Sequence, residues 1–439
     1  MRTTINYIVM LMVLALAASC SKSSNGDADS LLRTIPADAS SVAILNLEQT
    51  VASLGSKTDG KTIDLNKDLQ KAIIESNAIS DRNKQIFTDV CSGETGVSIT
   101  SMAFFSAARI YVTGLLDDPD KFVDYVQRRG YQNAADSVAP AAVREENGAR
   151  VIDNIVVIGN QFWICSMGSP DTDQLKYYQN LNENQSYASS DAASLLLEDG
   201  KVLTFVADVN RTLAQMPEAT YSRMAASLMF DDIAYIAGSA TVDKKNILSE
   251  AVVLNSKMQP SELLLPTEKI DADIVKSLNK DGDVFIAAGL PKKLTKKISE
   301  TLTTAFGANA SAITGAFQQV DGTVALCADV DANSVEARIQ TTGKDFAALS
   351  QMIQMIPGTT VSRDGDVLTV KYGQGVASGD CSAADAAAKM KGAWIGFVGS
   401  DIPGKGVNTV ARLVPDGKSL KLDVRLLGGL DALLSGLLK

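Results

Sequence analysis

The run Ser41-Val42-Ala43-Ile44-Leu45 lies near the start of the chain, and a run of the same character, Asp283-Val284-Phe285-Ile286-Ala287, lies in its second half. Each run is short, apolar and bounded by polar residues, which predicts a buried strand. A helical pattern follows each one, and the first run is followed by helical patterns at 48–54 and 62–76. These two runs decide the fold prediction, because similar elements follow both of them in the same order.

After the first run, the predicted elements are strands at 97–105 and 108–115, a helix from Pro119 to Gly130, strands at 143–152 and 155–165, a helix at 192–197, a strand at 202–209 and a hairpin at 233–254. After the second run, they are strands at 324–329 and 335–342, a helix that begins at 344 and ends at Pro357-Gly358, a hairpin turned at 363–366, a helix at 382–390, a strand at 393–398 and a hairpin at 408–426. The matched order predicts an internal duplication. It indicates an α+β fold with two related halves, each an antiparallel sheet with packed helices.

The corresponding domain boundaries are 1–19 for a signal peptide, 20–34 for a lipidated cysteine and flexible tether, 35–266 for the first half and 267–439 for the second. The tether is assigned because it is rich in Ser, Asn, Gly and Asp, a composition typical of flexible linkers. A further helix, predicted at Thr212–Met229, has no counterpart in the second half and reads as an insertion.

The N-terminus has the features of a secretory signal peptide. Arg2 precedes an apolar run at 5–18, and Ala17-Ala18-Ser19 leads directly into Cys20. The run is shorter than the roughly 20 residues that cross a bilayer. We therefore expect export, with lipidation of Cys20 favoured and ordinary signal-peptide cleavage as the alternative.

The small residues before Cys20 resemble the lipobox of bacterial lipoproteins. Together with the start of the folded part at Ile35–Leu47, they resemble a class of Gram-negative (Bacteroidota-type) envelope lipoproteins with a domain of unknown function. The resemblance implies an acyl anchor on Cys20. Because Ser21 follows Cys20 instead of an aspartate, it also implies sorting to the outer membrane, on either the periplasmic or the surface face. It brings no catalytic residues with it.

Composition excludes several classes of function. The 439 residues are 46% hydrophobic and carry 41 Lys and Arg against 51 Asp and Glu, so the chain is globular and acidic. An acidic chain lacks the clustered cations that bind nucleic acid. It has no histidine, which removes the usual general base and the commonest zinc ligand.

Four cysteines follow Cys20, namely Cys91, Cys165, Cys327 and Cys381. Their wide spacing contains no metal-ligand or redox pair. Two disulfides are open to an exported protein, but Cys165 and Cys327 lie in apolar, strand-like runs. We favour four buried thiols that behave as small hydrophobic residues.

Several motifs resemble functional sites only in part. The loop 399–406 lacks the Ser or Thr that follows the lysine of a P-loop, and Ser277-Leu278-Asn279-Lys280 lacks the partner motifs of serine acylases. Asn279, Asp281 and Asp283 lack the closing glutamate of a calcium loop. The remaining candidates are interpreted structurally: helix capping for Asp117, Asp118 and Asp120, a solvated face for Lys292, Lys293, Lys296 and Lys297, and core packing for Trp163 and Trp394. No catalytic, cofactor-binding or metal-binding residue is predicted.

The functional hypothesis is a membrane-anchored envelope lipoprotein that acts as a binding or assembly-support module. We expect a membrane contact through the lipid on Cys20, a partner protein in the envelope and no nucleic acid. The partner surface is expected at a groove between the halves or on the helix Thr212–Met229. The alternative is a carboxylate-dependent, glycosidase-like hydrolase, which requires two carboxyl groups facing one pocket.

Overall fold

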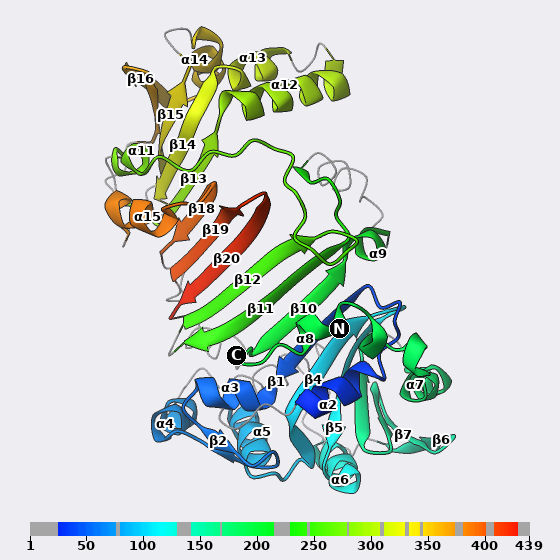
Figure 1. Ribbon diagram of the computed structural model, residues 1–439. Helices are drawn as coiled ribbons and strands as arrows, with labels where there is room; N and C mark the ends of the chain where they lie inside the picture. The colour runs from blue at the N-terminus through cyan, green and yellow to red at the C-terminus, as the bar shows by residue number, and fades with distance from the viewer. Residues whose placement is uncertain are drawn as a thin grey trace.

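The structure is a computed structural model, and it describes the residues 25–75, 80–129, 142–166, 169–214, 229–243, 246–278, 281–307, 311–329, 333–342, 346–373, 381–400 and 408–428. In this part of the chain, eighteen strands form one large sheet and two short strands form a separate hairpin (Figure 1). The prediction of an α+β fold built on antiparallel strands is confirmed.

All neighbouring strands of the large sheet run antiparallel. Their order across the sheet is β6-β7-β8-β9-β5-β4-β1-β10-β11-β12-β20-β19-β18-β13-β14-β15-β17-β16. The strands are β1 (Ser41–Asn46), β4 (Val97–Ser106), β5 (Ile110–Leu116), β6 (Arg144–Glu146), β7 (Ala149–Ile152), β8 (Ile155–Ile158), β9 (Gln161–Cys165), β10 (Leu203–Asp208), β11 (Tyr235–Asp243), β12 (Asn246–Leu254), β13 (Val284–Leu290), β14 (Val320–Asp329), β15 (Ser334–Thr341), β16 (Thr359–Asp364), β17 (Val367–Tyr372), β18 (Ile395–Gly399), β19 (Asn408–Asp416) and β20 (Ser419–Leu427). The small hairpin joins β2 (Lys57–Thr58) to β3 (Ile63–Asp64).

The helices lie on both faces of this sheet. They are α2 (Asn25–Leu32), α3 (Leu47–Ser53), α4 (Lys67–Glu75), α5 (Asp81–Cys91), α6 (Pro119–Arg129), α7 (Thr172–Gln179), α8 (Ala193–Leu196), α9 (Val209–Ala214), α11 (Ala272–Lys276), α12 (Lys292–Phe306), α13 (Ser311–Phe317), α14 (Ala347–Gln354) and α15 (Ala383–Met390), with short 3₁₀ turns at Glu183–Gln185 and Tyr187–Ser189. Polar side chains begin several of them. Asn46 accepts a hydrogen bond from the Gln49 amide at 2.7 Å at the start of α3, and Ser382 accepts one from the Asp385 amide at the start of α15.

Alternation along the strands divides the buried residues between the two faces. On one face, Val42 and Ile44 of β1 pack with α2, α7 and α8, and Phe285 and Ala287 of β13 pack with α11 and α15. We call this the α8/α15 face. The opposite face, which we call the α3/α12 face, packs against α3, α5 and α6 in the first half and against α12, α13 and α14 in the second.

The order of strands is the same on both sides of the β12–β20 pair. Outward from this pair, it is β12, β11, β10, β1, β4, β5, β9 and β8 on one side, and β20, β19, β18, β13, β14, β15, β17 and β16 on the other. The β4–β5 and β14–β15 pairings also each contain one break in register. The first side then continues with β7 and β6, which have no described counterpart on the second side.

The strand registers correct two details of the predicted correspondence. The turns of the β11–β12 and β19–β20 hairpins give a common starting point for comparing the two halves. When the strand pairings are followed outward from these turns, Ser41 is equivalent to Val284. The sequence pattern matches Ser41 with Asp283, one residue earlier. The hairpin turned at 363–366 has the position of the β8–β9 hairpin and not that of the β6–β7 hairpin. Both differences arise because apolar patterns alone do not define strand pairing.

Other predictions were wrong at the level of single elements. The flexible tether does not extend through 25–34, since helix α2 lies there and Leu31 and Leu32 are fully buried. The helix predicted at 62–76 is shorter and follows strand β3, and the strand predicted at 143–152 is the β6–β7 hairpin. Helices α5, α7 and α13 were not predicted. Most of the helix predicted at Thr212–Met229 lies outside the described residues.

Candidate functional site

The two halves of the sheet meet at the pairing of β12 with β20, which we call the seam. Near its middle, Glu250 of β12 lies directly opposite Asp423 of β20. Each is the fifth residue of its strand. Two carboxylates directly opposite each other destabilise a sheet, so this position requires cations nearby.

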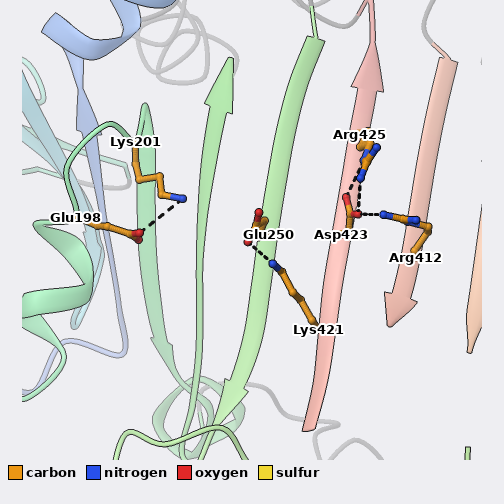
Figure 2. Close-up of polar contacts among 7 residues, drawn as sticks. All are labelled: Glu198, Lys201, Glu250, Arg412, Lys421, Asp423 and Arg425. Atoms are coloured by element: carbon orange, nitrogen blue, oxygen red, sulfur yellow. Dashed lines mark hydrogen bonds and ion pairs between the residues drawn. The ribbon is translucent and has the colours of Figure 1, made fainter. Parts of the chain in front are cut away.

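Three cations on the α8/α15 face meet this requirement. Lys421 lies 2.5 Å from a carboxylate oxygen of Glu250. Asp423 lies between Arg412 of β19 and Arg425 of its own strand, with 3.1 Å from the Arg425 guanidinium to its Oδ2 (Figure 2). The two carboxylates are thus held by ion pairs within and across three neighbouring strands.

The Asp423 carboxylate remains ionised at neutral pH. Burial alone would raise its pKa, but hydrogen bonds from Arg425 and Arg412 outweigh the effect of burial, and the pKa lies below its ordinary value. Its side chain is only 17% exposed, whereas Glu250 and Lys421 are half-exposed. Asp423 therefore stabilises the seam, and the Glu250–Lys421 pair is the part that faces solvent.

A groove of about 300 Å³, which we call the seam groove, begins at this pair. Its lining includes Leu195, Glu198, Lys201, Ser239, Glu250 and Lys421. The wall on the first-half side is formed by the end of α8 and the turn after it, where Lys201 lies 3.6 Å from Glu198 (Figure 2). The groove exists because the helices pack over the centre of each half and leave the seam strands between them open.

This arrangement suits recognition of a polar surface more than acid–base chemistry. Charges of both signs alternate along the groove, so a partner can exchange ion pairs and hydrogen bonds with them. A glycosidase requires one carboxyl group that is protonated near neutral pH. At Asp423, hydrogen bonds from Arg425 and Arg412 favour the carboxylate form instead, and Glu198 and Glu250 are held in ion pairs with Lys201 and Lys421.

Among the residues that the structure describes, no member of the sequence motifs lines this groove. Ser277 ends α11, where its hydroxyl donates to the Ile274 carbonyl and its own carbonyl accepts from Arg338. Of the loop 399–406, only Gly399 and Ser400 are described, at the end of β18 and buried. Asn279 also lies outside the described residues.

The structure supports the structural interpretations of the remaining motifs in part: Asp118 caps α6, whereas the Asp120 carboxylate pairs with Arg150. The Asp118 side chain accepts a hydrogen bond from the Lys121 amide at the start of α6. Lys292 begins α12 and contacts the Gln318 carbonyl and the Thr342 hydroxyl. Trp163 and Trp394 are core residues, 0% and 3% exposed. The groove residues, by contrast, were not predicted.

No disulfide joins Cys91, Cys165, Cys327 and Cys381 in the part of the chain that the structure describes. Burial raises the pKa of Cys91 to about 12 and that of Cys165 to about 11. Cys91 also lines a second pocket of about 260 Å³ beside α4 and α5. The prediction of buried thiols holds for Cys165, Cys327 and Cys381, whereas Cys91 is only partly buried. At Cys91 and Cys165 the raised pKa keeps the nucleophilic thiolate scarce.

Two features are absent from the described residues. They contain no cluster of three or more residues suited to hold a metal ion. They also contain no helix that is both long and apolar enough to span a membrane. Cys20, the predicted lipidation site, lies outside the described residues.

Comparisons with known proteins leave the chain without a family. No protein-family model and no curated protein matches it. Among solved structures, crystal form I of TP0453 is similar over 81% of this chain and 95% of its own, at 9% identity and a TM-score of 0.24. A similarity of this size carries no functional argument.

Proposed function

We propose that this protein is a lipid-anchored binding module of the bacterial cell envelope, and that the seam groove receives a polar partner. The observation that carries the proposal is the open seam. Helices cover the α8/α15 face in each half, while the charged pair Glu250–Lys421 stays half-exposed between them. A solvent-facing row of alternating charges in a concave surface is suited to a charged or hydrogen-bonding partner.

We also propose that the two halves are copies of one ancestral unit. The identical strand order on both sides of the seam supports this origin, as do the matched breaks in the β4–β5 and β14–β15 registers. In such a chain, pairing β12 with β20 joins equivalent strands about a pseudo-two-fold axis near Glu250 and Asp423. The seam groove is then the feature that neither half possesses alone.

Anchoring rests on the N-terminal sequence. An acyl group on Cys20 would hold the folded part beside a membrane, and the short segment before α2 would keep it close. We infer an outer-membrane location from Ser21, as in the lipoprotein class that the N-terminus resembles. Together, these proposals describe an envelope protein that binds a neighbouring component near the membrane surface.

Photo-crosslinking in intact cells tests the groove as the partner surface. A benzophenone amino acid replaces Leu195, which is 36% exposed and lines the groove, or Tyr177 on α7, which is 53% exposed and lies outside it. We expect a discrete adduct from position 195 and none from position 177. The same adducts from both positions, or none from position 195, would contradict the proposal.

A further inference from the structure

Strand β16 ends the large sheet on the side of the second half. Its described pairing is with β17 alone, in an unbroken register from Thr359 to Asp364. Four of its six residues are exposed, namely Thr360, Ser362, Arg363 and Asp364. In the described part of the chain, no strand covers its outer side.

The outer side of β16 offers main-chain hydrogen-bonding groups. The β16–β17 hairpin closes at the pair Asp364–Val367 around a two-residue turn. In such a hairpin, the closing pair is hydrogen-bonded and alternate residues point the other way. The amide and carbonyl groups of Val361 and Arg363 therefore point away from β17, where another strand can pair with them.

Most of this edge lacks the usual protection against pairing. Edge strands are commonly blocked by proline, charged side chains, a bulge or extreme shortness, and on β16 only the last two residues, Arg363 and Asp364, are charged. The stretch Thr359-Thr360-Val361-Ser362 has none of these and consists largely of β-branched residues, which favour a strand. The opposite edge, β6, is only three residues long and reads Arg-Glu-Glu. The two ends of the sheet thus differ sharply in their capacity to pair.

The first half of the chain covers the corresponding edge itself. Strand β8 has the position of β16 in the strand order, and it pairs on its outer side with β7 through Val156–Val151 and Ile155–Ile152. The strand in this place of the sheet order, β8 in the first half, thus already pairs with an additional antiparallel strand in this protein. In the second half, the described chain supplies no such strand.

We propose that β16 pairs antiparallel with β16 of a second copy of this chain. A register with Val361 on the two-fold axis places Thr360 opposite Ser362 of the second copy, and Thr359 opposite its Arg363. This register pairs a β-branched residue with itself and hydroxyl side chains with each other, and it sets no like charges directly opposite. A pairing of one strand with itself closes as a two-fold dimer.

Two exposed apolar side chains beside the edge support this choice of partner. Met355 is 72% exposed and Ile356 is 55% exposed, and both precede β16 directly. Large apolar side chains at a sheet edge mark an interaction surface. In the dimer, the start of one β16 strand lies beside the turn of the other, so both side chains gain a neighbouring surface.

The test uses charge at the exposed positions 360 and 362. In the proposed register, T360K/S362K sets like charges opposite each other twice, and T360E/S362E does the same with the opposite sign. Sedimentation equilibrium of the full-length lipoprotein in density-matched detergent measures the mass at up to about 100 µM, where a micromolar Kd gives mostly dimer. We expect a dimer for the wild type, a monomer for each variant, and a dimer again when the two variants are mixed.

The variant T303K/T304K is the matched control, because it adds the same charge at exposed threonines of α12. It is expected to remain a dimer. A monomeric wild type would overturn the proposal, and so would a dimer that persists in both charge variants. In the proposed register, mixing the lysine and glutamate variants places lysine opposite glutamate. A mixture that stays monomeric would therefore exclude this register.

Discussion

The most buried ion pair of the second half joins Glu336 and Arg338 on β15. Their side chains are 0% and 9% exposed, and 2.8 Å separates their charged groups. Arg338 also donates to the Ser277 carbonyl at the end of α11 and to the Thr369 hydroxyl of β17. One guanidinium therefore connects a helix end, a neighbouring strand and a buried carboxylate.

Replacement of Arg338 by alanine should destabilise the fold strongly, because it leaves the Glu336 carboxylate buried without its cation. Loss of one partner of a buried pair costs about 3–5 kcal/mol. Urea unfolding of the purified protein measures the change. The control is Arg150→Ala, whose partner Asp120 is 90% exposed; an exposed pair contributes about 1 kcal/mol or less. Equal losses in the two variants would contradict this assignment.

Single residues were predicted well where burial alone decides their role. Trp163, Trp394, Cys165 and Cys327 lie in apolar runs, and such runs form the core. Around the groove, the sequence shows only that charged and apolar residues alternate in Lys421-Leu422-Asp423-Val424-Arg425. Such alternation indicates a strand with one face toward solvent. The pairing of these residues with Glu250 depends on a contact between distant segments that no local pattern records.

Among the secondary-structure elements, the prediction failed where tertiary contacts stabilise a helix whose local composition is typical of a linker. The start of α2 is polar, and its composition indicated a linker. Yet Leu31, Leu32 and Ile35 are fully buried against the first-half core. Three apolar residues in so short a segment do not establish the helical periodicity of hydrophobic residues. The helix is stabilised by packing against the sheet, which the local sequence does not reveal.

The ion pairs of Asp423 give the seam a definite pH dependence. Its pKa lies below its ordinary value in the folded protein, so its stabilisation is fully present above the unfolded pKa of about 3.9 and is lost as the pH falls through the folded value. Asp423→Asn should therefore lower the urea midpoint by a constant amount from pH 7 to 5. The gap to wild type should close below about pH 4. A gap that stays constant into the acid range would show that Asp423 acts through its shape and not through its charge.

At the scale of the whole molecule, the antiparallel α+β class and the order of elements in each half could be predicted from the sequence. The single continuous sheet could not. It depends on the pairing of residues 247–252 with 421–426, and each of these strands reads on its own as the second strand of an ordinary hairpin. Low sequence similarity between the halves also hid the one-residue shift at Ser41.

Replacement of Cys20 by alanine should release the protein from the membrane fraction. No other cysteine lies beside the predicted signal peptide, so the proposed lipid attachment has no substitute site. Metabolic labelling with a fatty acid and detergent partitioning measure the effect, with Cys91→Ala as a variant that keeps both label and anchor. Equal labelling of Cys20→Ala and wild type would contradict lipidation at this position.

The most direct test of the seam groove measures partner recognition separately from seam stability. The single variant K421E breaks the Glu250–Lys421 pair, and the double variant E250K/K421E restores an ion pair with its charges exchanged. The benzophenone adduct from position 195 is then quantified in cells, and urea unfolding reports the stability of each variant. We expect the double variant to regain wild-type stability but to form little adduct, since its partner meets the reversed charges. An undiminished adduct in the double variant would contradict the groove as the binding surface.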